Sequence, residues 1–425
     1  MSKLRITIFL LCSQLVFACG GSESPVAPPS QLADAAEVTV YDKDADIAEP
    51  AVAAAPDGGL YVLYIEHHAD KSSDVYLQRV DSSLKLDGER VRVNKIGGEV
   101  KTWAGDPPTI GAAADGTVYV GWTRKVTSTS GSGTDLMVSV SHDGGLTFDD
   151  PVKVNDDSLP ASHGMHSLAL GQNGEVYAAW LDERALRSGA DGGTHHQAPK
   201  SEDSAEPNSE VYFAVSKDGG KSFSQNRRIA GDVCPCCKTS MAVAADGTLY
   251  LSWRQVLPES FRHIAVAASD DRGESFKQSV IVSDDKWQIN ACPVSGASMT
   301  AGAGGKLEVI WYSAGSAGAP GLYRAESKNN GQSFEARSLI STDAISGTPV
   351  LLSEENSSAI YVFGASDKRV TFAAADQSAL GDVDNGVLPA AALSKGKLIA
   401  AFVRSGDENR SVRLIERDLR NLAKH

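Results

Sequence analysis

Apolar residues recur along the chain in pairs of short runs separated by a polar turn. Five copies are clear and the last two are weaker: PAVAAAPDGGLYVLY from Pro50, PTIGAAADGTVYVGW from Pro108, HSLALGQNGEVYAAW from His166, TSMAVAADGTLYLSW from Thr239, ASMTAGAGGKLEVIW from Ala297, PVLLSEENSSAIYVF from Pro349 and LPAAALSKGKLIAAF from Leu388. Each copy predicts a strand, an Asp-Gly-type turn and a second strand. The chain is therefore expected to consist mainly of repeated antiparallel strand pairs.

A second short motif follows each of the four middle copies. It reads S-x-[DN]-x-G-x-[ST]-F and occurs as SHDGGLTF (141–148), SKDGGKSF (216–223), SDDRGESF (269–276) and SKNNGQSF (327–334). Its third residue, which is Asp143, Asp218, Asp271 or Asn329, caps its own turn, and the glycine takes a positive backbone angle φ. The final Phe anchors the turn on the core. We expect a third strand to lead into this turn and a fourth strand to follow it.

The turn motif resembles the Asp box of sialidases and related BNR-repeat proteins. Four-stranded units that recur at roughly 50 residues indicate a β-propeller. The resemblance covers residues 37–420 and implies an all-β fold, a β-propeller of six to seven four-stranded blades with Asp-box turns. The segment AEVTVYD near residue 40 is expected to supply the outer strand of the last blade and so to close the ring.

The N-terminal segment carries sorting signals instead of the repeat. A basic start precedes an apolar run that is too short to span a membrane, which predicts a signal peptide over residues 1–18. The segment LVFAC resembles a bacterial lipobox, which implies that Cys19 is lipidated. Gly20 favours the outer membrane of a Gram-negative cell, while cleavage to an ordinary periplasmic protein stays open. Residues 19–36 are expected to form a flexible tether, and residues 37–425 the propeller.

Composition and charge narrow the classes of partner. The chain has 40 glycines and 7% aromatic residues, which suits strands and turns. No basic run offsets the formal net charge of -14, so we expect no binding to nucleic acid. Contact with a membrane is expected only through the N-terminal lipid.

The unusual chemistry of the sequence lies in GDVCPCC, which holds Cys234, Cys236 and Cys237. When the repeats are aligned on the Asp-Gly turn, Cys234 and Cys292 occupy the same position in consecutive blades. Loops between blades share one end of a propeller, close to its axis, so these sulfur atoms are expected at one mouth. The corresponding loop of the preceding blade, ASHGMHS, brings further donors to that end: His163, Met165 and His166.

Three interpretations of the cysteines stay open. Cysteines in an oxidising compartment form disulfides, and Cys292 could bridge two loops to one of the other three. Thiolates near a His or Met also suit a soft metal ion, copper or zinc, although the spacing matches no standard zinc motif. The third interpretation is redox catalysis by the C-x-x-C pair Cys234 and Cys237. It is disfavoured because such reactivity relies on a helix N-terminus, which a propeller loop lacks.

The resemblance to sialidases implies a glycan-hydrolysing site with an arginine triad, a Tyr-Glu nucleophile pair and an Asp acid/base. The first of those arginines lies in an R-I-P motif, but the corresponding stretch here, DADIAEPAVA, has no arginine. Residues that follow the second strands are candidates for a rearranged site: Arg124, Asp182, Glu183, Arg184, Arg254 and Tyr312. The alternative is that these side chains are solvated or paired with one another.

Three functions therefore stay open. The leading one is a cell-envelope lipoprotein that binds a soft metal ion, or an envelope partner protein, at the cysteine end. The alternatives are a sialidase-like exo-glycosidase acting on a glycan, and a structural propeller with disulfide-stapled loops. An insertion over residues 185–210 follows a second strand, and its His195 and His196 are expected either to collect metal ions or to belong to a polar loop.

Overall fold

The computed structural model describes residues 37–41, 44–158, 160–188, 208–353, 358–375, 379–405 and 409–419 of the 425-residue chain. All of them belong to one compact unit, Leu32–His425. They form 28 β-strands, one short helix, α1 (Arg184–Ser188), and two 3-10 turns, η1 (Pro258–Ser260) and η2 (Ala303–Gly305). No described helix has the length and apolar character that crossing a bilayer requires. The predicted signal peptide, Cys19 and the tether lie outside the described residues.

The strands form four-stranded antiparallel blades, numbered here from the N-terminus. Blade 1 is β2 (Asp46–Ala54), β3 (Leu60–His67), β4 (Ser73–Val80) and β5 (Leu86–Arg92), and blade 2 is β6 (Thr109–Ala112), β7 (Val118–Ser128), β8 (Gly131–Ser141) and β9 (Val152–Lys153). Blade 3 is β10 (His163–Leu170), β11 (Val176–Asp182), β12 (Ser209–Ser216) and β13 (Arg227–Val233), and blade 4 is β14 (Ser240–Val243), β15 (Leu249–Leu257), β16 (Phe261–Ser269) and β17 (Val280–Ile281).

The remaining strands complete three further blades. Blade 5 is β18 (Ser298–Ala301), β19 (Leu307–Ser313), β20 (Gly321–Ser327) and β21 (Ser338–Ser341), and blade 6 is β22 (Ile345–Leu352), β23 (Ile360–Ala365), β24 (Val370–Ala374) and β25 (Ala379–Val383). Blade 7 is β26 (Val387–Ser394), β27 (Lys397–Ser405) and β28 (Arg410–Asp418), with β1 (Val38–Thr39) as its fourth strand. The described strands thus confirm a β-propeller and make seven blades of the predicted six to seven.

Blades 3 and 4 run together as one eight-stranded sheet. The two blades join where β13 pairs with β15 through Val233 and Gln255. The Gln255 side-chain amide also donates to the carbonyls of Gly231 and Asp232, both at 2.8 Å. β14 pairs separately with β15, so blade 4 keeps its own four strands. This junction lies directly before the cysteine loop.

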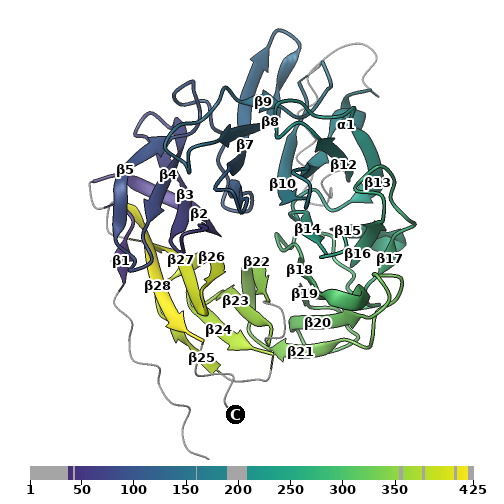
Figure 1. Ribbon diagram of the computed structural model, residues 1–425. Coiled ribbons are helices and arrows are strands. Elements are labelled where there is room, and N and C mark those ends of the chain that lie inside the picture. The colour runs from purple at the N-terminus through teal and green to yellow at the C-terminus, as the bar shows by residue number, and fades with distance from the viewer. Residues whose placement is uncertain are drawn as a thin grey trace, which may run out of the picture. The chain divides into compact units, whose positions relative to one another are not determined.

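The blades follow one another around a ring, with the first strand of each blade toward the centre (Figure 1). β1 closes the ring by pairing antiparallel with β28, so that Val38 lies opposite Leu414. The sequence predicted this closure from the segment near residue 40. An ion pair of 2.7 Å between Arg410 of β28 and Asp46 of β2 also links blades 7 and 1.

The second strand of each blade carries the core. Apolar side chains project from both faces of these strands because a neighbouring blade covers each face. Four tryptophans near the ends of such strands are each at most 1% exposed: Trp122, Trp180, Trp253 and Trp311. Burial of the repeated strands is therefore the main apolar contribution to the fold.

Two kinds of loop leave the ring at opposite ends. In a blade of four antiparallel strands, the inter-blade loop and the loop between the second and third strands share one end. The Asp-Gly turn and the Asp box share the other end, which is called the Asp-box end below. The cysteine loop joins β13 to β14 and therefore lies at the first of these ends, called the axial end below.

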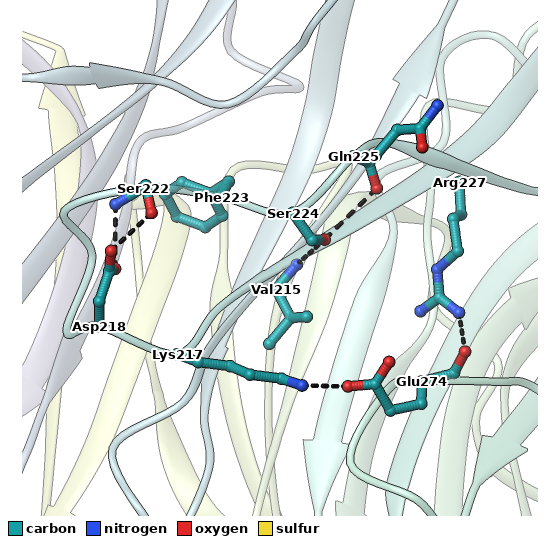
Figure 2. Close-up of a pocket in the computed structure, with 9 residues that line it drawn as sticks. All are labelled: Val215, Lys217, Asp218, Ser222, Phe223, Ser224, Gln225, Arg227 and Glu274. Carbon is teal, nitrogen blue, oxygen red and sulfur yellow. Dashed lines mark hydrogen bonds and ion pairs between the residues drawn. The ribbon is translucent and has the colours of Figure 1, made fainter.

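The Asp boxes form capped turns. In blade 3, Asp218 Oδ1 accepts hydrogen bonds from the Ser222 backbone at 3.0 Å and from Ser216 Oγ at 2.7 Å. Figure 2 shows this turn beside a surface hollow of about 560 Å³. Each described charged residue around the hollow has a partner, as Lys217 does in Glu274 of the next Asp box. The hollow therefore lies at the contact between blades 3 and 4.

The Asp-box glycine locks each turn onto the preceding blade. Gly220 has a φ of 88°, which an L side chain rarely adopts. A Cβ atom at Gly220 would also lie 2.7 Å from Cγ2 of Val140 in blade 2. The motif thus needs its glycine for both backbone conformation and inter-blade contact.

Acidification is expected to weaken three of the four Asp boxes. Burial opposes ionisation of Asp143, but hydrogen bonds from Thr147 lower its pKa to about 2. Asp218 and Asp271 also have a pKa of about 2. Because these values lie below the ordinary 3.8, the boxes stabilise the fold above that pH and lose this contribution as the pH falls toward 2. Asn329 does not titrate.

This pH dependence can be measured by thermal unfolding of a variant with Asn at Asp143, Asp218 and Asp271. As the pH falls from 3.8 to about 2, the melting temperature of the variant is expected to decrease less than that of the native chain. Equal slopes in the two proteins would show that the boxes do not contribute to the acid sensitivity.

Candidate functional site

A cavity of about 630 Å³ opens at the axial end, among loops of blades 2 to 5. His163 and Met165 of blade 3 line it, together with Cys236 and Cys292 from the loops that lead into blades 4 and 5. Trp103, from the loop between β5 and β6, is 42% exposed and lines it as well. The fold thus collects donors that are far apart in the sequence.

A β-bulge positions Met165 at this cavity. The register of β10 against β11 shifts between Gly164 and Ser167, and Met165 takes a φ of 53°. Bulges bend a strand and re-aim its side chains. The Met165 carbonyl accepts a hydrogen bond of 3.0 Å from the backbone of Thr239, which follows the cysteine loop. The bulge therefore ties blade 3 to the loop that carries the cysteines.

The four cysteines of the propeller form one cluster. Cys236 and Cys292 form a disulfide with Cα atoms 6.1 Å apart, which confirms the predicted bridge between loops. Cys234 and Cys237 are free and fully buried. The Sγ atom of Cys234 lies 3.3 Å from that of Cys237 and 3.7 Å from that of Cys236. The Sγ atoms of Cys234, Cys236 and Cys292 all lie within 4.8 Å of one another.

The local sequence explains why these cysteines leave the sheet. β13 ends at Val233, and Pro235 cannot donate to a continuing ladder. The Cys234 backbone is still held, because its N–H donates to the Arg254 carbonyl at 2.9 Å. The loop thus turns sharply while its first cysteine stays fixed against blade 4.

Two buried arginines lie beside the cluster. Nη1 of Arg262 donates to the Cys234 sulfur at 2.9 Å. Arg254 donates through Nε and Nη2 to the Ser295 carbonyl, at 3.1 and 2.8 Å, and its Nη1 has no hydrogen-bond partner among the described residues. Within the described part of the chain, no carboxylate pairs with either guanidinium. The two positive charges therefore face thiols, backbone carbonyls and, for Arg254, the Trp287 ring at 4.9 Å.

These charges separate the two free thiols. The hydrogen bond from Cys237 and the charge of Arg262 lower the pKa of Cys234 to about 6, although burial acts against this shift. Burial raises the pKa of Cys237 well above its ordinary value. At neutral pH, Cys234 is therefore expected as a thiolate and Cys237 as a thiol.

A buried carboxylate ties three blades together near the cavity. Oδ1 of Asp106 lies 2.9 Å from Nζ of Lys238 and 3.2 Å from Nδ1 of His166. Asp106 precedes β6, His166 lies in β10, and Lys238 precedes β14. Burial opposes the charge of Asp106, but the charges and hydrogen bonds of Lys238 and His166 together hold the pKa of the carboxyl below its usual range. His166 contacts this carboxylate through Nδ1 and does not line the cavity.

His163 is held between two carboxylates. Its Nε2 lies 3.1 Å from Asp157 Oδ1 and 3.4 Å from Asp182 Oδ2, and its Nδ1 contacts the Thr134 carbonyl. Burial favours the neutral ring, but the hydrogen bond to Asp157 and the charge of Asp182 raise the pKa of His163. His163 therefore forms a wall of the cavity with its Nε2 beside two carboxylates.

The arginines considered for a glycan-hydrolysing site have separate partners. Arg124 donates to Asp135 at 2.8 Å, and Arg184 donates to Asp182 through Nε at 2.9 Å. Arg254 is buried and donates to backbone carbonyls. Each guanidinium is thus engaged by its own set of groups, as expected for paired structural charges.

The other candidates for that site have different surroundings. Tyr312 packs edge-on against Trp287, with ring centroids 5.7 Å apart. Asp182 is fully buried and also accepts a hydrogen bond of 2.8 Å from the Trp180 indole. Glu183 is the one member of the six candidates that lines the cavity. His195 and His196 lie outside the described residues.

Three residues of this region were not among the sequence candidates: Asp157, Lys238 and Arg262. Lys238 directly follows Cys237, so its position in the sequence could have drawn attention to it. Arg262 lies near the start of β16 and reaches the cluster because β15 and β16 pair with Val256 opposite it. No local pattern in the sequence reports that register.

Comparisons with known proteins bear on the fold. No protein-family model matches the sequence, and no curated protein does. An ulvan lyase, a polysaccharide lyase, has 11% identity over 91% of this chain and 99% of its own, with a TM-score of 0.54. A mutant of the NanB sialidase from Streptococcus pneumoniae has 10% identity, covers 90% of this chain and 94% of its own, and has a TM-score of 0.47. A leech intramolecular trans-sialidase has 10% identity, covers 90% and 92%, and has a TM-score of 0.48.

At such identities the comparisons concern the fold alone. The similarity in fold rests on the ulvan lyase, whose TM-score is 0.54. The chemistry of the cavity is therefore inferred from the residues that line it. The chain is therefore similar in fold to this lyase, and its own strands establish the β-propeller that the repeats predicted.

Proposed function

We propose that this chain binds a soft metal ion, copper(I) or zinc(II), through the cysteine cluster at the axial end. The observation that carries the proposal is the buried charge: Arg254 and Arg262 have no carboxylate partner among the described residues, and the cysteines lie beside them. Buried charges need counter-charges. In the disulfide form, Cys234 alone can supply a thiolate.

A metal–thiolate centre would balance these charges. Zinc(II) held by four thiolates carries two net negative charges, and copper(I) held by three thiolates also carries two. Either centre matches the positive charges of Arg254 and Arg262. The ligands would be drawn from Cys234, Cys236, Cys237 and Cys292, and the thioether of Met165 lines the adjoining cavity.

The spacing of the sulfur atoms suits such a centre. Zinc–sulfur bonds of about 2.3 Å in a tetrahedron separate the sulfur atoms by roughly 3.8 Å. Cys234 Sγ lies 3.3 Å from Cys237 Sγ and 3.7 Å from Cys236 Sγ. Cys292 Sγ belongs to the group that lies within 4.8 Å. After reduction of the disulfide, small shifts would bring these atoms to a shared ion.

The proposal also gives the ion a location in the cell. A lipidated Cys19 would hold the propeller at the outer membrane of a bacterium, or cleavage would release it to the periplasm. A partner protein of the envelope would then deliver or receive the ion. Because the disulfide and the metal use the same cysteines, the redox state of the envelope would decide which state forms.

The metal content of the reduced protein tests the proposal. The chain purified without chelator and under mild reductant is expected to carry about one copper or zinc ion, measured by inductively coupled plasma mass spectrometry. The variant Cys236→Ser/Cys292→Ser is expected to lose that ion, and the Asp-box variant Asp218→Asn is expected to keep it. A reduced native chain that holds no ion after exposure to zinc(II) and copper(I) would reject the proposal.

A structural role is the second candidate, because the Cys236–Cys292 disulfide joins the loops that lead into blades 4 and 5. It makes a different prediction: reduction would lower stability and no ion would bind. Glycan hydrolysis lacks comparable support, since the candidate arginines are engaged separately.

A further inference from the structure

We infer that the four cysteines also form an internal thiol–disulfide exchange site, in which Cys234 moves the disulfide from an outer pair, Cys236 and Cys292, to an inner pair, Cys234 and Cys237. The exchange uses no metal ion. This inference therefore goes beyond the proposed function and does not depend on it.

Cys234 stands between the two pairs. Its Sγ atom lies 3.3 Å from that of its inner partner, Cys237, and 3.7 Å from that of Cys236, which belongs to the disulfide. Thiol–disulfide exchange proceeds by attack of a thiolate on a disulfide sulfur. The attacking and accepting atoms are thus already close in the folded chain.

The two pairs differ in access to solvent. Cys236 and Cys292 line the axial cavity, and Cys292 is partly exposed. Cys234 and Cys237 are fully buried and do not line it. The outer pair can therefore meet reagents from the cavity, while the inner pair is shielded from them.

Arg262 supplies positive charge at the attacking sulfur. Its Nη1 atom lies 2.9 Å from Cys234 Sγ and its side chain is buried. In thioredoxin-type sites a helix N-terminus has this role, and its absence is the reason why the sequence disfavours redox chemistry. The guanidinium takes the place of that helix, through a contact that only the strand register creates.

The exchange balances without any further reagent. In the first step, Cys234 gives its proton to solvent and attacks Cys236: the Cys234–Cys236 bond forms, the Cys236–Cys292 bond breaks, and Cys292 leaves as a thiolate that takes up a proton from solvent. In the second step, Cys237 loses its proton and attacks Cys234: the Cys234–Cys237 bond forms, and Cys236 leaves and takes up that proton. The inner pair loses two electrons and the outer pair gains them.

The inner pair of thiols can thus supply the two electrons that reduce the outer disulfide. Opening exposes two thiols to the cavity beside Met165. The hydrogen bond from Arg262 to Cys234 Sγ belongs to the form with a reduced inner pair. A reagent that captures the freed outer thiols would draw the exchange forward.

Trypsin separates the two forms cleanly. Cys234, Cys236 and Cys237 share the peptide 229–238, and Cys292 lies in the peptide 287–306. With the outer bridge closed, the two peptides stay linked. After exchange, the peptide 229–238 holds an internal disulfide, and the peptide 287–306 carries a free thiol.

The experiment is alkylation of the full-length, metal-free chain by N-ethylmaleimide without reductant, followed by trypsin and mass spectrometry. One equivalent of dithiothreitol beforehand brings any fully oxidised chain to one disulfide. In the native chain, the peptide 287–306 is expected to become alkylated at Cys292, at a rate at least about tenfold above that in Cys234→Ser. In Cys234→Ser, the two peptides are expected to stay linked.

Cys237→Ser is the matched control, because it keeps the first step and removes the second. It is expected to release and alkylate Cys292, leaving a Cys234–Cys236 disulfide. Circular dichroism melting of both variants checks that each is folded, and Cys234→Ala replaces Cys234→Ser if the latter is not. Equal alkylation of Cys292 in the native chain and the Cys234 variant would overturn the inference, as would absence of Cys292 alkylation in both.

This outcome is independent of the metal test. A chain that exchanges its disulfide but binds neither copper(I) nor zinc(II) would retain the exchange site and reject the metal site. A chain that binds an ion when reduced but shows no exchange would do the reverse.

Discussion

Replacing Lys238 by methionine is expected to lower the free energy of unfolding by about 3–5 kcal/mol, because the change leaves a buried carboxylate without its ammonium partner. Nζ of Lys238 lies 2.9 Å from Asp106 Oδ1 and 2.9 Å from the Pro107 carbonyl, and both charged side chains are almost fully buried. His166 is the other cation beside Asp106, at 3.2 Å. Burial and the charge of Lys238 lower the pKa of His166 in the native chain, so a proton gained by His166 in the variant would set how much of the loss is offset. Urea unfolding at neutral pH, with all cysteines reduced, measures the change.

Two comparisons make this experiment specific. Lys217→Met removes an exposed lysine that pairs with Glu274 at the Asp-box end, and is expected to change the free energy of unfolding far less. The double variant Asp106→Asn/Lys238→Met removes both charges and is expected to recover most of the loss. If Lys238→Met were as stable as Lys217→Met, the buried carboxylate would not be the link between blades 2, 3 and 4.

Replacing Arg262 by methionine is expected to weaken binding of zinc(II) to the reduced chain by about 10- to 100-fold. The change removes a hydrogen bond from a charged group to the Cys234 sulfur, at 2.9 Å, and such bonds contribute about 1.5–3 kcal/mol. It also leaves a metal–thiolate centre with one buried counter-charge, Arg254, in place of two. Competition with a chromophoric zinc chelator measures the affinity.

A matched arginine separates local from general charge effects. Arg272 pairs with Glu175 at the Asp-box end and is 59% exposed, so Arg272→Met is expected to leave the zinc affinity unchanged. Arg262→Lys keeps the charge and is expected to retain part of the affinity. An unchanged affinity in Arg262→Met would contradict the charge balance on which the proposed metal site rests.

Most of the architecture could be predicted because its signals are local. An Asp-Gly turn between two apolar runs specifies a hairpin within a few residues, and the Asp box caps its own turn. The closing strand could also be predicted, since β1 continues the same pattern at the other end of the chain. The blade number was harder to predict. The copies from Pro349 and Leu388 have no Asp box, yet β22–β25 form a complete blade and β26–β28 form another with β1.

The candidate site could also be predicted only in part from the sequence. The sequence placed Cys234 and Cys292 at equivalent positions of neighbouring blades and so predicted that the loops would meet. It did not predict which cysteine would bond to Cys292, because Cys234, Cys236 and Cys237 are too close in sequence to be told apart by repeat position. The bridge to Cys236 depends on how the chain turns after Val233.

His163 and Arg254 are two residues whose surroundings the sequence did not predict. Both were singled out for their chemistry, as a metal ligand and as a substrate-binding arginine. Their roles depend on neighbours from other blades: Asp157 and Asp182 engage His163, and the Ser295 carbonyl engages Arg254. These contacts, and not the residue type, decide which donor and acceptor atoms of a side chain remain available to a ligand.

Short-range information in the chain therefore specified the hairpins, the Asp boxes, the ring and the end at which the cysteines gather. Contacts between blades specified the rest: the disulfide partner, the Arg262–Cys234 contact and the carboxylate shared by Lys238 and His166. The physical reason is range. Turn and strand preferences act over a few bonds, whereas the charge and reactivity of a thiol depend on groups that only the closed ring brings within 4 Å.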